Sequence, residues 1–266
     1  MRALPLVAAT FTLVLLPLWW TAPAASSHEL LPSEIVDLMR ENPDLTVDQI
    51  DAFLDEQQKQ AAIKKVEQIQ SANDPNAGIG SMMVNFLSLG VQHILEGLDH
   101  VLFVLSLLLV FVSLRKTLKL VTAFTVAHSI TFLVAGTGLL TLSPRLVEPL
   151  IALSIAYVAV TTVFFARHPF FGAGSNKTAS VFFFGLFHGL GFAGLLTDLN
   201  VPDNHFLLAL VSFNVGIELG QLMIITAALP FIYLLRKYAW YSTAIKVVAV
   251  GISGLAFFWA FQRIFG

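Results

Sequence analysis

The stretch that decides the fold of this chain runs from Gly90 to His100. It reads Gly-Val-Gln-His-Ile-Leu-Glu-Gly-Leu-Asp-His and continues as Val-Leu-Phe-Val-Leu-Ser-Leu-Leu-Leu-Val-Phe-Val. Two histidines and two carboxylates therefore lie at the start of an apolar segment that is long enough to enter a bilayer. Placing ionisable groups in a bilayer costs free energy, so their presence there indicates a functional role. At about 100° per residue, His93, Glu96 and His100 share one helix face, with Asp99 at its edge. Imidazole and carboxylate bind divalent transition metals, so the pattern indicates a membrane protein that handles a metal cation.

The composition agrees with a polytopic membrane protein. The 266 residues are 56% hydrophobic and only 12% charged, with a mean hydropathy of +0.79. Soluble domains carry about 25% charged residues. The sequence has no cysteine, which excludes a disulfide framework, a thiolate metal site and a cysteine nucleophile. No basic patch with interleaved aromatic residues indicates a nucleic-acid partner.

The N-terminal third differs from the rest. Residues 1–24 are typical of a secretory signal peptide, with Arg2, an apolar run and the cleavage motif Ala22-Pro-Ala24. An uncleaved first transmembrane helix is the alternative. Residues 25–80 are predicted to form an acidic, helical periplasmic segment and a linker. Residues 28–76 hold eleven acidic and four basic residues. Such a segment is either a solvated amphipathic helix pair or a surface that gathers cations.

An all-α domain of six transmembrane helices is predicted over residues 81–266. The first apolar segment is too long for one span, because about 32 residues at ~1.5 Å each cover ~48 Å against a core of ~30 Å. We therefore expect a break or a partly interfacial turn near Ser88–Gly90. The six predicted segments are residues 82–113, 118–140, 147–165, 179–197, 206–235 and 242–262.

Basic residues predict the orientation of these segments. Arg115, Lys116 and Lys119, then Arg167 and Lys177, then Arg236, Lys237 and Lys246 all fall at one set of ends. Because cytoplasmic loops are rich in lysine and arginine, these ends are predicted to face the cytoplasm. The N-terminal segment and the C-terminus then lie in the periplasm of a bacterium, and the helices lie in its inner membrane.

Further polar side chains occur within the predicted spans. Each could be ordinary packing between helices, but a mid-span histidine or glutamate needs a partner such as a cation. The predicted metal ligands are His93, Glu96, Asp99, His100, His128, His188 and Glu218, and the residues predicted to support them are Thr125, Ser129, Asn214, Gln221 and Glu148.

The four ionisable residues of the first segment are predicted to form two successive metal-binding positions, called here the outer and the inner station. On a straight helix, His93 and His100 are about 10 Å apart along the axis, which is too far to share one ion. The outer station would hold His93 and Glu96. The inner station would hold Asp99 and His100 together with His128, His188 and Glu218.

Four motifs in order resemble a known family. His93-Ile-Leu-Glu-Gly-Leu-Asp-His100 is similar to the H-P-x-x-G-x-D-H signature of the HupE/UreJ membrane proteins, with Ile94 in place of proline. Phe184-x-x-x-His188-Gly189 is similar to the second signature of the family. With F-T-x-A-H-S at residues 124–129 and F-N-x-G-x-E-x-G-Q at residues 213–221, the pattern resembles the second HupE/UreJ branch. The resemblance implies nickel or cobalt permeation.

The sequence thus predicts a permease for a divalent transition-metal cation, with nickel, cobalt or zinc as substrate or ligand. No nucleotide-binding P-loop motif is present, so energy would come from the membrane potential or a partner. Two alternatives stay open: an intramembrane zinc-dependent hydrolase, which would use the same histidines and carboxylates, and a membrane accessory protein for metalloenzyme maturation. The sequence also leaves open a homo-oligomer.

Overall fold

A computed structural model describes residues 78–109, 113–137, 139–140, 142–165, 176–191 and 203–265. The predicted signal peptide and nearly all of the acidic segment lie outside these residues. The described part of the chain folds into helices without strands, as predicted. The helices are α5 (Ile79–Glu96), α6 (Leu98–Leu108), α7 (Leu114–Gly136), α8 (Pro144–Phe164), α9 (Asn176–Gly191), α11 (Asp203–Leu235) and α12 (Tyr241–Phe265).

Four of these helices are long and apolar enough to cross a membrane, namely α7, α8, α11 from His205 onward, and α12. The pair α5 and α6 makes a fifth candidate if it counts as one bent span. The predicted span over 179–197 is described only as α9, whose 16 residues cover ~24 Å, and residues 192–202 lie outside the description. Six spans therefore stay a prediction.

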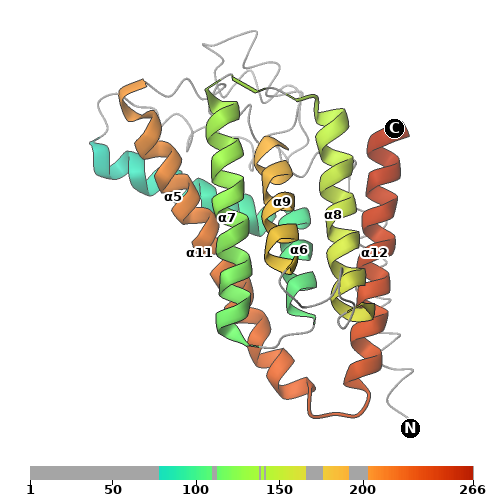
Figure 1. The fold of residues 1–266 in the computed structure, drawn as a ribbon. Coiled ribbons are helices and arrows are strands. Elements are labelled where there is room, and N and C mark those ends of the chain that lie inside the picture. Colours follow the sequence, from blue (N-terminus) through green and yellow to red (C-terminus); the bar gives the residue numbers. More distant parts are fainter. Residues whose placement is uncertain are drawn as a thin grey trace, which may run out of the picture.

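The helices pack in three main pairs: α5 with α11, α7 with α9, and α8 with α12. In Figure 1, α6 lies among the upright helices, whereas α5 and α11 run obliquely along one side. The first turns of α7 and α9 and the turn between α11 and α12 lie at the lower end of the bundle in Figure 1. The first turns of α7 and α9 carry Arg115, Lys116 and Lys177, and the turn after α11 carries Arg236 and Lys237.

Two of the pairs depend on glycine. A Cβ atom on Gly90 of α5 would collide with the backbone oxygen of Phe213 in α11. A Cβ atom on Gly189 of α9 would collide with the backbone oxygen of His128 and with Thr131 Oγ1 in α7. Gly185, one turn before Gly189 in α9, also lies against the backbone of α7, at Phe124. Glycine allows the close backbone approach that brings His188 beside α7.

The first apolar segment does break, but the predicted position is wrong. Helix α5 continues through Ser88–Gly90 and ends at Glu96, and α6 begins at Leu98 with a bend of 69°. Gly97 between them has an extended backbone (φ −72°, ψ 96°), and its N–H donates to the His93 carbonyl oxygen at 3.0 Å. Span length shows that a break is needed, but it does not locate the break.

Candidate metal centre

The bend places three histidines from three helices together. His93 comes from α5, His100 from α6 and His128 from α7, and one ligand nitrogen from each lies within 4.8 Å of the others. The ring centroids of His93 and His100 are 4.6 Å apart, and both lie about 6 Å from that of His128 (6.0 and 6.2 Å). All three side chains are buried, with at most 2% exposed.

The predicted separation of His93 from His100 into two stations is therefore wrong. The 10 Å estimate assumed one straight helix, whereas the chain turns through 69° at Gly97 and brings the two rings face to edge. A metal ion bound by imidazole lies about 2.0–2.1 Å from each nitrogen. Small rotations of these rings would bring the three nitrogens within reach of one ion.

His188 of α9 lies beside this group. Its ring centroid is 5.3 Å from that of His100, and its side chain is fully buried. The Nδ1 atom of His188 lies 2.9 Å from the carbonyl oxygen of Phe184. Because a carbonyl oxygen only accepts, Nδ1 is the donor in this contact, and in a neutral ring the lone pair is then on Nε2. Metal-binding histidines are commonly oriented by a bond of this kind.

Phenylalanine rings surround the histidines, and no role near the metal ligands was predicted for them, although Phe124 and Phe213 open two of the quoted motifs. The Phe124 ring centroid lies 4.9 Å from that of His188 and about 6 Å from those of His100 and His128 (6.2 and 6.1 Å). Phe103 lies 5.2 Å from His188, and Phe213 lies 5.7 Å from His93. Helical spacing could have identified two of them, since Phe124 precedes His128 by four residues and Phe103 follows His100 by three. An apolar shell of this kind controls the access of water to a metal site.

The predicted supporting residues of α7 and α11 bond to one another. Thr125 Oγ1 donates to Gln221 Oε1 at 2.9 Å, and Ser129 Oγ donates to Asn214 Oδ1 at 2.7 Å. Glu218 of α11 belongs to the same interface. Its Oε1 accepts a hydrogen bond of 2.6 Å from the hydroxyl group of Thr122 in α7.

An open groove of about 410 Å³ runs beside this interface, and Thr125, Ser129, Asn214 and Glu218 contribute to its wall. Its other lining residues are apolar: Ile130, Leu133, Leu210, Val211 and Val215. The structure thus places Glu218 at the α7–α11 interface and not in the group of three histidines.

Two other predicted ligands are not part of the group of three histidines. Glu96, the last residue of α5, is exposed. Asp99 is fully buried in the first turn of α6, and its Oδ2 lies 2.9 Å from Arg263 Nη2 of α12. Arg263 was not predicted to belong to this site, and no periodicity could have indicated it, because it lies 164 residues from Asp99.

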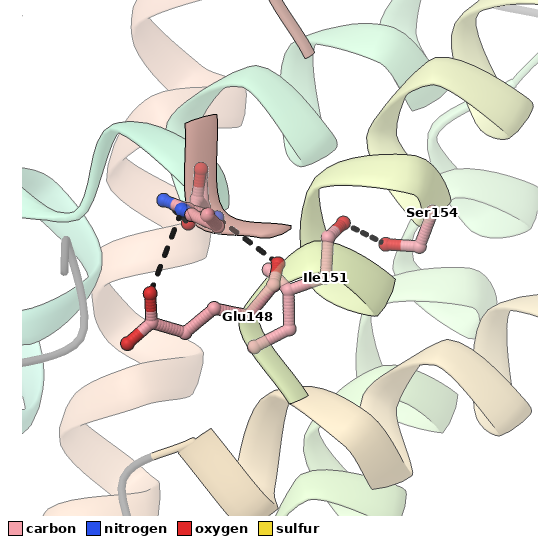
Figure 2. Close-up of polar contacts among 5 residues, drawn as sticks. Glu148, Ile151 and Ser154 are labelled. Atoms are coloured by element: carbon pink, nitrogen blue, oxygen red, sulfur yellow. Dashed lines mark hydrogen bonds and ion pairs between the residues drawn. The ribbon is translucent and has the colours of Figure 1, made fainter. Parts of the chain in front are cut away.

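Arg263 also reaches the first turns of α8. Its Nη1 donates to the backbone oxygen of Glu148 at 3.1 Å, and its Nε lies 3.7 Å from Glu148 Oε2. Figure 2 shows both contacts of Glu148, together with the Ser154 hydroxyl that donates to the Ile151 backbone oxygen one turn further along α8. Glu148, predicted as a supporting residue, is therefore linked to Asp99 through Arg263.

One comparison with known proteins gives a match. A family model described as HupE / UreJ protein matches residues 68–263, which include nearly all of the described helices. Neither a curated protein nor a solved structure matches the chain.

Proposed function

Because the chain belongs to the HupE/UreJ family, we propose that it is an integral membrane permease for a divalent transition-metal cation, with nickel or cobalt as its cargo. The observation that carries this proposal is the buried group of His93, His100 and His128. Three imidazoles from separate helices form a nitrogen site of the kind that suits nickel, cobalt and zinc. Few other reasons exist to bury them together in the apolar core of a membrane protein.

The proposed ligands are these three histidines, with His188 beside them as a fourth. Glu96, exposed at the end of α5, would meet the cation first. Ligation requires neutral imidazole, so protonation of the histidines would favour release. In this proposal the basic ends of the helices face the cytoplasm, and the protein lies in the inner membrane of a bacterium.

The proposal favours a permease over an intramembrane zinc hydrolase. Three histidines around an open position would also suit a zinc enzyme, but such an enzyme needs a water molecule and a carboxylate base. In the described part of the chain, the nearest neighbours of the group include phenylalanine rings, and the carboxylate of Asp99 is bonded to Arg263. A membrane accessory protein for metalloenzyme maturation could use the same metal site, but it would bind the cation without transporting it across the membrane.

The test is uptake of radiolabelled nickel and cobalt into proteoliposomes that contain the purified protein. Wild-type vesicles should accumulate the cation, and vesicles with His100→Ala or His128→Ala should not. His205→Ala is the matched control, because this histidine lies at the start of α11 and outside the group. Binding of the metal without accumulation would favour the accessory role, and no binding at all would refute the proposed metal site.

A further inference from the structure

Contacts with other helices hold the direction of the bend at Gly97, among them the packing of α5 on α11 and of α6 on α8. Within the backbone, the bend is marked only by the Gly97 N–H bond to His93 and by the start of α6, where the Val101 N–H donates to the Gly97 oxygen at 3.0 Å. These bonds continue the helical pattern on each side. They do not fix the angle between α5 and α6, because one extended residue can connect two helices at many angles.

A side-chain contact from another helix does reach the bend. Asp99 lies two residues after Gly97 and one residue before His100, and its carboxylate is bonded to Arg263 at 2.9 Å. The Asp99 side chain is fully buried, and only 9% of that of Arg263 is exposed. A buried ion pair with one partner removed leaves an uncompensated charge, so each group strongly restricts where the other can lie.

Arg263 is itself held in place. Three different nitrogen atoms of its guanidinium group face oxygen atoms: Nη2 faces Asp99, and Nη1 and Nε face the backbone and the carboxylate of Glu148. Its guanidinium carbon also lies 5.7 Å from the Trp259 ring centroid. The planar guanidinium offers donors in a fixed fork, which a lysine cannot reproduce. Arg263 thereby ties the start of α6 to α8 and α12.

We propose that Arg263 is a positioning residue for the metal centre, which holds the α5–α6 bend through Asp99 so that His100 faces His93. Asp99 acts through Arg263 and is not a metal ligand. This inference rests on the proposed function in one respect only, namely that the histidines bind a metal. It also states a specific role for the aspartate of the His93–His100 motif in this chain.

The first measurement is a double-mutant cycle on Co²⁺ affinity of the purified full-length protein, followed by the visible absorption of the bound ion. Asp99→Asn and Arg263→Gln should each weaken binding by about 10- to 100-fold, the usual effect of residues that support a ligand. The double variant should bind at least as well as either single variant, because two amides can bond to each other and no buried charge is left alone.

A directly ligating aspartate would give a different pattern. If Asp99 were itself a ligand, its loss would remain in the double variant, which would then bind more weakly than Arg263→Gln. The cobalt spectrum would also change in Asp99→Asn but not in Arg263→Gln. Either result overturns the proposal. Arg263→Lys should bind more weakly than the wild type, because a lysine cannot reproduce the fixed fork of donors.

A second measurement does not depend on metal. Since the sequence has no cysteine, spin labels can be attached to cysteines introduced at Val84 of α5 and Phe257 of α12, both of which are more than half exposed. Arg263→Gln should broaden or shift the distance distribution between the labels, and the double variant should restore it. An unchanged distribution in Arg263→Gln would refute the positioning role. If the wild type bound no Co²⁺, the proposed function would fail while this measurement still decided the role of Arg263.

Discussion

His93 and His100 are seven residues apart in the chain, yet their ring centroids are 4.6 Å apart, because the helix that would separate them is broken at Gly97. The same two residues on a continuous helix would be about 10 Å apart along the axis. The grouping of the histidines, and with it the proposed metal centre, therefore depends on the bend at Gly97.

Removing one histidine should remove the site. His93→Ala, His100→Ala and His128→Ala should each lower Co²⁺ affinity by at least about 100-fold, because three nitrogens become two and no cysteine is available as a substitute ligand. Isothermal titration in detergent would measure this, with His205→Ala as the control. Three single variants that all bind as the wild type does would contradict the assignment.

Replacing the glycine at the bend should favour a straighter helix. Gly97→Ala removes a helix-breaking residue, and alanine is preferred over glycine in a helix by about 1 kcal/mol. We expect weaker Co²⁺ binding in a protein that still inserts and stays monodisperse. Gly80→Ala is the control, because Gly80 lies in the same helix pair and has open space around its Cβ position. Equal losses in both variants would show that the bend is not the cause.

The glycine beside His188 should be intolerant of any side chain. In Gly189→Ala the new methyl group would collide with backbone of α7 at His128, and the helices would have to separate. Overpacking of this kind costs roughly 1–3 kcal/mol of stability. Thermal unfolding in detergent should show a lower midpoint than that of Gly80→Ala. A midpoint unchanged from the wild type would mean that α7 and α9 are not packed this closely.

The variant Glu218→Gln tests whether transport can be lost while metal binding at the histidines is kept. In Glu218→Gln the shape and the hydrogen bond from Thr122 can be kept, since an amide oxygen also accepts, but the charge is lost. If the carboxylate handles a cation on its way through the bundle, uptake into proteoliposomes should fall sharply while Co²⁺ affinity at the histidines stays the same. Full uptake in Glu218→Gln would assign this residue to helix packing, and a loss of affinity would return it to the metal centre.

The predicted orientation can be checked directly. Reporter fusions at residue 70 and after Gly266 should both report a periplasmic location, and a fusion in the turn after α11, near Arg236 and Lys237, should report a cytoplasmic one. A cytoplasmic C-terminus would contradict both the orientation and the count of six spans.

The sequence predicted the helices better than it predicted their contacts. Hydropathy placed spans at 118–140, 147–165, 206–235 and 242–262, and the structure has helices at Leu114–Gly136, Pro144–Phe164, Asp203–Leu235 and Tyr241–Phe265. These agree because a bilayer requires long apolar segments with few interruptions. Helix ends differed by a few residues, since polar caps such as Ser113, which accepts from Lys116 N–H, extend a helix beyond its apolar part.

Four of the seven predicted ligands lie together in the structure, whereas Glu96, Asp99 and Glu218 are not part of the group of three histidines. These four are His93, His100, His128 and His188. They were predicted as ligands because burying an ionisable side chain in a membrane costs free energy, and the structure brings their rings together. The partner of Asp99 could not be found in this way. Residues from α6 and α12 meet only through tertiary packing, and a single sequence has no periodicity that reaches across so many residues.

The contact between Asp99 and Arg263 has a consequence for the order of synthesis. The three histidines are complete once α7 has been made, but the arginine that reaches Asp99 belongs to the last turn of α12. A nascent chain that already carries every imidazole would therefore still lack the residue that aligns them. In this protein the capacity to hold an ion tightly would mature only after the final helix has entered the bundle, so that partly made chains would not trap scarce metal during biogenesis.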